Sequence, residues 1–164
     1  MTAEELVEFW QKSASEDLRV AKDNLKLGHF HWALFFYQLV IEKVLKSLIV
    51  KRKDKNPLPT HNLVKLSEEA GINYRAASWR GILERVQKSL FLCRLHSSSL
   101  LEGIRRVEIK LSLRQKQDFK EITTFNIEAR YDDIKLSFYK KATRKYCAKW
   151  SKKCEEYYLW LKEK

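Results

Sequence analysis

The stretch from residue 29 to 50, HFHWALFFYQLVIEKVLKSLIV, constrains the fold of this chain more than any other segment. At about 100° per residue, its apolar side chains form a continuous arc over roughly half of a helix circumference. A helix with so wide an apolar arc must be covered by several neighbours, so the stretch predicts a central, buried helix. Opposite the arc, Gln38, Glu42 and Lys46 follow one another at steps of four residues and form a single polar stripe.

The polar stripe has two interpretations. Glu42 precedes Lys46 by four residues, which is the favourable order for an ion pair within a helix, so the stripe is consistent with the solvated edge of a buried helix. Alternatively, it faces a groove or a dimer partner, where its polar groups would contact a ligand or a second chain. The stripe alone does not distinguish these alternatives.

The segments that flank the central helix carry their own start and stop signals. Thr2 and Glu5 have the spacing of a capping box and predict a helix that ends near Gly28. The short turn at Gly28 predicts that this helix folds back antiparallel on the central one. After the central helix, Pro57 and Pro59 predict a loop, and Thr60 is a candidate cap for a third helix that ends at Gly71.

The C-terminal part continues the helical pattern. Ser112 and Gln115 have the spacing of a second capping box, which predicts a short helix followed by an irregular stretch over residues 125–134. A last helix is then predicted over residues 134–164, with one apolar face formed by Phe138, Ala142, Tyr146, Trp150, Cys154, Tyr157 and Leu161. With only 4 Gly and 2 Pro, the chain has little turn chemistry for many short strands. The sequence therefore predicts one all-α domain over residues 1–164, an up-and-down bundle of four or five helices.

The charge of the chain restricts its partners. The net charge is +12, and residues 61–164 hold 23 Lys and Arg against 13 Asp and Glu. Such a surface suits a polyanion such as RNA, DNA or a nucleotide-bound partner, although lysine-rich solvated helix faces also occur without a ligand.

The chain has no uncharged apolar run of membrane-spanning length and no basic, apolar leader, so we expect a cytoplasmic protein with no membrane partner. Three cysteines without a CxxC pattern favour reduced thiols.

Several blocks of the sequence resemble a known family. The blocks SEDLRVAKDNL, GHFHWALFFYQLVIEKVLKSLI, PTHNLVKL and FNIEARYDD, in this order, are similar to the prokaryotic HEPN domain (higher eukaryotes and prokaryotes nucleotide-binding). The resemblance covers residues 5–74 and 111–161. It implies a HEPN-like helical bundle that is usually a homodimer. It also implies a partner, a minimal nucleotidyltransferase, in a toxin–antitoxin pair or a two-part transferase whose HEPN chain binds nucleotide or RNA.

The chain departs from that family in two respects. Many members are metal-independent ribonucleases with an Arg and a His separated by four to six residues, and none of the four histidines here has an Arg at that distance before it. This departure favours a protein without catalytic residues. The second departure is an extra segment, about residues 75–110, inserted between the third and fourth family helices. A loop of this length without secondary structure is uncommon, so we expect it to be partly helical.

Motif position and charge nominate a set of ligand-binding residues. His61 stands at the start of a helix, where its imidazole would bind phosphate or serve as a packed structural side chain. Arg130 with Tyr131 would grip a phosphate and stack a base, or lock a turn through a carboxylate. The predicted site contains Gln38, Glu42, Lys46, His61, Arg130 and Tyr131, with no metal and no cofactor other than a possible nucleotide ligand.

Two other functional hypotheses remain open on the sequence. One is a ribonuclease toxin with a divergent active site, using His96 with Arg85 or Arg94. The other is a purely structural interaction module, which would bind a neighbouring protein without any affinity for nucleotides.

Overall fold

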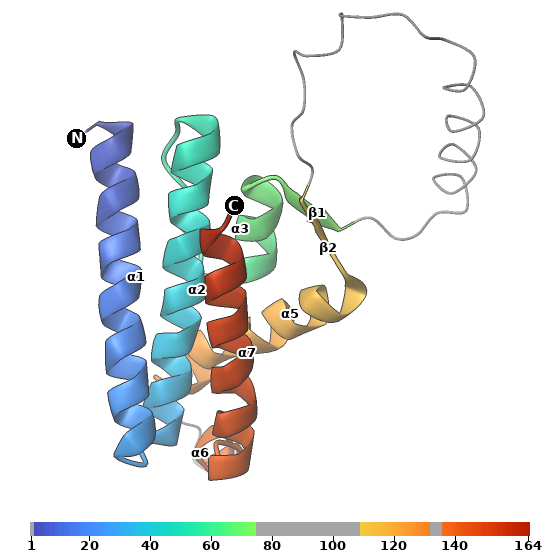
Figure 1. Ribbon diagram of the computed structural model, residues 1–164. Coiled ribbons are helices and arrows are strands. Elements are labelled where there is room, and N and C mark those ends of the chain that lie inside the picture. The colour runs from blue at the N-terminus through green and yellow to red at the C-terminus, as the bar shows by residue number, and fades with distance from the viewer. Residues whose placement is uncertain (1, 75–108, 132–135) are drawn as a thin grey trace, which may run out of the picture.

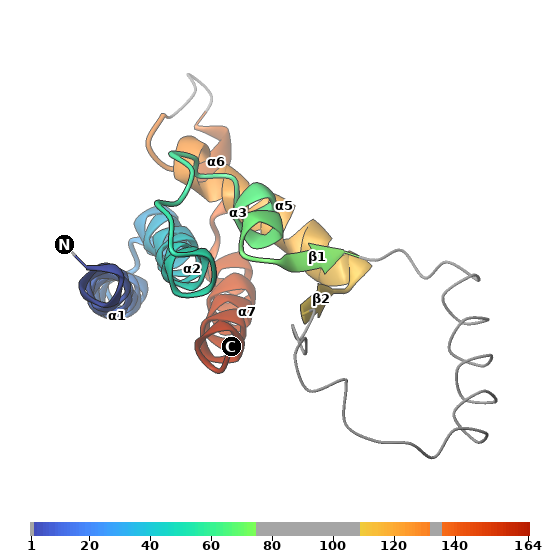
Figure 2. The same ribbon diagram turned by 90° about the horizontal axis from the view of Figure 1, so that it is seen from above.

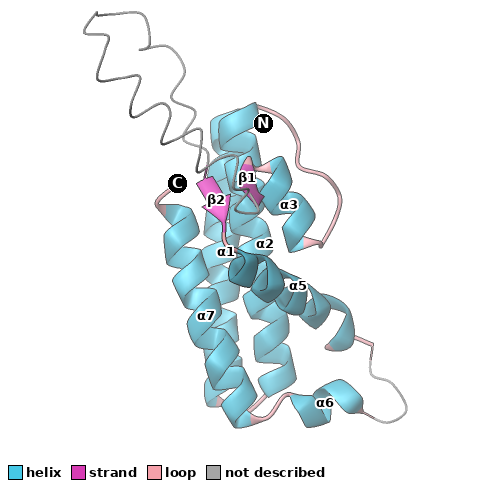
Figure 3. Ribbon diagram, turned by 90° about the vertical axis from the view of Figure 1, so that its right-hand side faces the viewer, coloured by secondary structure: helices cyan, strands magenta, loops and turns pink. Residues whose placement is uncertain are grey.

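The computed structural model describes residues 2–74, 109–131 and 136–164. The described elements are, in chain order, α1 (Ala3–Lys26), α2 (Phe30–Lys53), α3 (Leu63–Glu69), β1 (Ile72–Tyr74), β2 (Ile109–Leu111), α5 (Leu113–Glu128), α6 (Ser137–Lys141) and α7 (Arg144–Lys162). Helices α1, α2 and α7 run side by side, and α5 crosses them obliquely (Figures 1 and 3). The predicted all-α bundle is confirmed.

The hairpin of α1 and α2 forms as its end signals predict. The hydroxyl of Thr2 accepts from the backbone N–H of Glu5, and the carboxylate of Glu5 accepts from the backbone N–H of Thr2 at 2.8 Å. Gly28 follows the last turn of α1 with φ +80°, a left-handed conformation that costs glycine little. The chain therefore reverses over three residues, and α2 packs antiparallel along α1 (Figure 1).

Helix α2 is the centre of the molecule. It contacts each of the other described helices, α1, α3, α5, α6 and α7, and the view along its axis shows it surrounded by them (Figure 2). Its inner positions are almost entirely removed from solvent, which matches the wide apolar arc of the sequence. The buried side chains of α2 include Ala33, Leu34, Tyr37, Val40, Ile41, Val44, Leu45, Leu48 and Ile49.

The third helix begins later than the sequence suggests. Asn62, rather than Thr60, is its N-cap, and the Asn62 side chain accepts from the backbone N–H of Lys65 at 3.1 Å. The prediction of Thr60 as the cap was wrong, because its hydroxyl instead accepts from the backbone N–H of Asn62 in the turn before the helix.

After α3, strands β1 and β2 pair in parallel over three residues each, with Ile72 opposite Ile109. No sequence pattern predicts this pair, and residues 75–108 of the predicted insertion lie outside the described residues.

The C-terminal helices differ from the prediction in length. Helix α5 continues to Glu128 and is not short, because Phe125 and Asn126, assigned to an irregular stretch, are buried against the core. The predicted last helix is two helices, since α6 ends at Lys141 and Thr143 caps α7 by accepting from the backbone N–H of Tyr146. The apolar period runs across this break without interruption, so periodicity gave no sign of it.

Polar contacts between helices fix α7 on the bundle. Asp118 of α5 is buried and accepts hydrogen bonds at 2.6 Å from the Nζ of Lys153 and from the hydroxyl of Tyr157. The hydroxyl of Tyr37 on α2 donates to Glu155 at 2.8 Å. None of the described helices is both long and apolar enough to cross a membrane.

Candidate functional site

The polar stripe of α2 lies inside the protein. Gln38 is fully buried and Glu42 is 3% exposed, so the solvated-edge interpretation of the stripe is wrong. The Glu42 carboxylate accepts from the Nζ of Lys46 and from the side-chain amide of Gln38, each at 2.8 Å. It also lies 3.0 Å from Nδ1 of His61, which stands before α3. One buried carboxylate therefore joins two turns of α2 to the loop that leads into α3.

The hydrogen bonds keep Glu42 ionised. Burial alone would raise the pKa of this carboxyl, but the hydrogen bonds from Lys46, Gln38 and His61 outweigh burial and lower the pKa. An ionised carboxylate only accepts hydrogen bonds, so Nδ1 of His61 carries the hydrogen that faces Glu42. Glu42 thus engages Nδ1 and not the other ring nitrogen, Nε2. The His61 side chain is 58% exposed.

The same network continues from α2 to the end of α5. The side-chain amide of Asn126 donates to Oε1 of Gln38 at 3.0 Å. Arg130 donates from Nε to the backbone carbonyl of Asn126 at 2.8 Å, and a second guanidinium nitrogen contacts Oδ1 of Asn126. Among the described residues, Arg130 thus holds the end of α5 through an amide and a carbonyl. Asp132 and Asp133, which follow it in the FNIEARYDD block, lie outside those residues.

Aromatic rings flank both ends of this network. The guanidinium carbon of Arg130 lies 5.6 Å from the ring centre of Phe35 and 5.5 Å from that of Tyr131. At the other end, Nζ of Lys46 lies 5.0 Å from the ring centre of Trp10 on α1. These distances fall within the range of cation–π attraction. We call the connected set of Gln38, Glu42, Lys46, His61, Asn126 and Arg130 the polar network.

The structure brings the six predicted site residues together but gives them different access to solvent. Arg130 is exposed and Tyr131 is 70% exposed, whereas the side chain of Lys46 is only 13% exposed. His61, Arg130 and Tyr131 can therefore touch a ligand directly. Gln38, Glu42 and Lys46 hold those groups in place from inside, an arrangement suited to binding an anion beside a planar ring.

Two members of this region, Asn126 and Trp10, are absent from the predicted site. Asn126 lies in the FNIEARYDD block but is not among the predicted site residues, although it stands four residues before Arg130, a spacing that places two side chains on one helix face. Trp10 carried no comparable signal, since only the packing of α1 on α2 brings it to Lys46. Within the described residues, no three His, Cys, Asp or Glu side chains gather where they would hold a metal ion.

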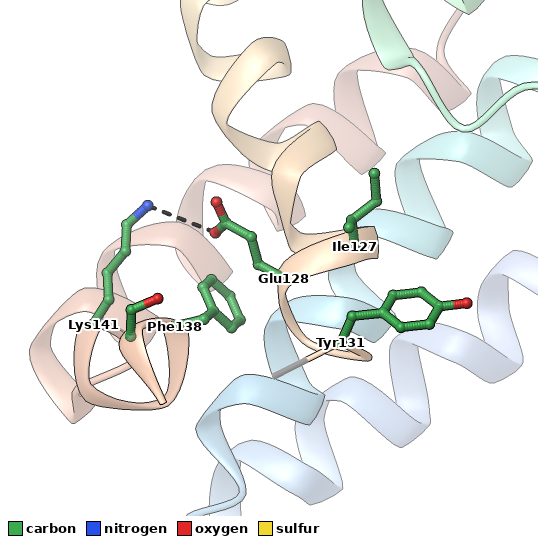
Figure 4. A pocket seen from close by; sticks show the side chains of 6 residues that line it. Ile127, Glu128, Tyr131, Phe138 and Lys141 are labelled. Atoms are coloured by element: carbon green, nitrogen blue, oxygen red, sulfur yellow. Dashed lines mark ion pairs between the residues drawn. The ribbon is translucent and has the colours of Figure 1, made fainter. Parts of the chain in front are cut away.

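A small pocket lies next to the polar network, between the end of α5 and α6 (Figure 4). Its volume is about 240 Å³, which is below the usual size of a pocket for a drug-sized ligand. Lys141 and Glu128 both line the pocket, with Nζ of Lys141 3.9 Å from Oε2 of Glu128. The same Nζ forms an ion pair with Oε1 of Glu121 at 2.9 Å. The lining residues are Ile127, Glu128, Tyr131, Ser137, Phe138 and Lys141.

Comparisons with known proteins agree with this architecture. The family model described as the HEPN domain matches residues 7–98. The crystal structure of TT1696 from Thermus thermophilus is similar with a TM-score of 0.61, at 19% sequence identity and with 96% of each chain covered. At that identity the likeness concerns the fold alone. No curated protein matches the chain.

Proposed function

The chain belongs to the HEPN domain family, and we propose that it is a non-catalytic member that binds nucleotide or RNA and pairs with a minimal nucleotidyltransferase. The observation that carries the ligand part is the polar network, which holds Arg130 and His61 at the surface from a buried frame. Groups fixed in this way lose little conformational freedom when they bind an anion.

The charge and chemistry of the exposed residues support an anionic, aromatic ligand. Arg130 is a planar cation that can bind a phosphate, and the exposed ring of Tyr131 beside it can stack a base. Two adjacent residues thus match the two parts of a nucleotide. The net charge of +12 attracts such a ligand over a longer range. The absence of the family's Arg–His spacing supports binding without cleavage.

The binding test is a titration of the purified protein with ATP and with a short fluorescent single-stranded RNA at low salt. We expect saturable binding of at least one of them, weakened at least fivefold by Tyr131→Ala, because that exposed ring supplies stacking worth about 1 kcal/mol or more. Tyr131→Ala leaves every hydrogen bond of the polar network in place. Arg130→Ala should weaken binding as well, because it removes the exposed cation.

The control is Arg19→Ala, which removes an exposed arginine of α1 that is paired with Glu16. It should bind the ligand as the wild type does. If neither ATP nor RNA binds the wild-type protein at low salt, the ligand part of the proposal is wrong, and the chain is a structural interaction module.

The partner part rests on the family and is tested separately. We expect a minimal nucleotidyltransferase encoded by the same genome to co-purify with this chain, as a toxin–antitoxin pair or a two-part transferase. We also expect the chain alone to be a homodimer through its long helices. Co-expression followed by light scattering on the purified complex checks both expectations, and a chain that elutes only as a free monomer would contradict them.

A further inference from the structure

A group of aromatic side chains gathers at the end of the bundle where α2 begins and α6 lies. Trp32 is 40% exposed, Tyr139 is 58% exposed and Tyr131 is 70% exposed. Monomeric proteins seldom expose several large rings together unless they bind something there. We call this surface the aromatic patch and define it by His31, Trp32, Phe35, Arg130, Tyr131 and Tyr139.

The members of the aromatic patch touch one another in series. The ring centres of Tyr139 and His31 are 5.2 Å apart, and those of His31 and Trp32 are 5.3 Å apart. Trp32 lies 5.9 Å from Phe35, which in turn lies 5.6 Å from the guanidinium carbon of Arg130. Tyr131 then follows Arg130 at 5.5 Å. Planar groups from α2, α6 and the end of α5 thus form one continuous series of contacts, with Trp32, Tyr131 and Tyr139 exposed along it.

Many of these planes are tilted with respect to their neighbours. The angle between the rings is 56° for His31 and Tyr139, 46° for His31 and Trp32, and 83° for Trp32 and Phe35. The rings therefore do not saturate one another by parallel stacking. The exposed rings keep area that a flat ligand would cover.

The surrounding charge selects the kind of ligand. Lys140 follows Tyr139 directly, Arg144 and Lys145 open the next helix, α7, and all three are exposed. They form no ion pair with any of the described residues. A second copy of this chain, also at +12, would bring like charge against this end. A strand of nucleic acid brings phosphates to the cations and bases to the rings. Proteins that bind single strands combine such cations with aromatic side chains on which bases stack.

We propose that the aromatic patch is a stacking surface for unpaired bases of single-stranded RNA. This inference rests on the proposed function and adds to it, because it extends the ligand contact from Arg130 and Tyr131 to Trp32 and Tyr139. Several nucleotides would then be bound, and discrimination would favour unpaired over duplex RNA. Bases in a duplex are stacked on each other and cannot lie on side-chain rings.

The test compares three probes on the wild-type protein: a twelve-nucleotide oligouridine strand, an abasic strand with the same number of phosphates, and a twelve-base-pair RNA duplex. We expect the oligouridine strand to bind at least fivefold more tightly than the other two. Trp32→Ala and Tyr139→Ala should each weaken oligouridine binding about fivefold or more and leave binding of the abasic strand unchanged.

The matched control is Leu159→Ala on α7, which removes a large side chain of similar exposure, 61%, outside the patch. It should not change the affinity for any probe. Circular dichroism of each variant confirms that the helices are intact.

The outcomes separate this inference from the proposed function. If the wild-type protein binds no RNA and no ATP, both the proposed ligand binding and the stacking surface are wrong. If RNA binds but abasic and oligouridine strands bind equally, the inference alone is overturned. Loss of nucleotidyltransferase binding in Trp32→Ala, with RNA binding unchanged, would overturn it as well, because the patch would then dock a protein.

Discussion

At the scale of single residues, Glu42 is the position on which the polar network depends. Replacing it with Gln removes the charge but nearly keeps the volume, and it leaves the largely buried ammonium of Lys46 without its ion-pair partner. We expect Glu42→Gln to lower the free energy of unfolding by about 3 kcal/mol at pH 7, as measured by urea denaturation. The exposed Glu16→Gln, which breaks a surface pair with Arg19, should cost less than about 1 kcal/mol.

The pH dependence of this effect has a definite sign. Because the fold lowers the pKa of Glu42 below its ordinary value of 4.5, the carboxylate stabilises the folded state fully above pH 4.5. That stability is lost as the pH falls through the folded pKa. The difference between wild type and Glu42→Gln should therefore shrink steadily in denaturation curves taken from pH 5 to pH 3. A difference that stays constant over this range would contradict an ionised Glu42.

The thiols of Cys147 and Cys154 are buried, which makes them poor nucleophiles in the folded protein. Burial raises the pKa of Cys147 from 9.0 to about 11, and burial raises the pKa of Cys154 as well. Since the thiolate is the reactive form, Cys147 at pH 8 should hold about a hundredfold less of it than an unperturbed thiol. We expect neither cysteine to be alkylated by iodoacetamide in the folded protein, and both to react after unfolding, as peptide mass spectrometry would report.

At the scale of elements, the break between α6 and α7 makes Thr143 informative. Its hydroxyl caps α7, so Thr143→Ala should destabilise the protein by about 1 kcal/mol, whereas Thr143→Ser should be nearly neutral. If residues 134–164 formed one continuous helix, the same Thr143→Ala change would be neutral or stabilising, because alanine is the better helix former. Thermal denaturation of the two variants distinguishes the arrangements by the sign of the change.

At the scale of the whole molecule, the net charge of +12 makes any RNA binding depend on salt. If the protein contacts two phosphates of a single strand, the affinity for that strand should fall about sevenfold between 50 mM and 200 mM NaCl. Removing one contacting cation, as in Arg130→Ala, should make the logarithmic salt slope shallower by about 0.7. Lys149→Ala on the exposed face of α7 should leave the slope unchanged. A shallower slope for both variants would mean that the charge of the molecule acts without a local site.

The sequence by itself determined the fold class and the central helix, because the apolar arc of residues 29–50 can be buried only by several surrounding helices. The two capping boxes and the turn at Gly28 were equally readable, since each depends on residues within four positions of one another. The sequence also nominated the six residues of the predicted site, but not Asn126 or Trp10. The role of those six residues as ligand contacts is a prediction.

Only the tertiary structure decided what those six residues do to one another. Whether the polar stripe met water or protein depended on the loop that carries His61 and on the end of α5, which lie 19 and more residues away along the chain. The break at Thr143 and the pairing of β1 with β2 were likewise hidden, because neither disturbs the local apolar period. Contacts between distant segments set burial, and burial turned a stripe of ordinary polar residues into a fixed frame for Arg130 and His61.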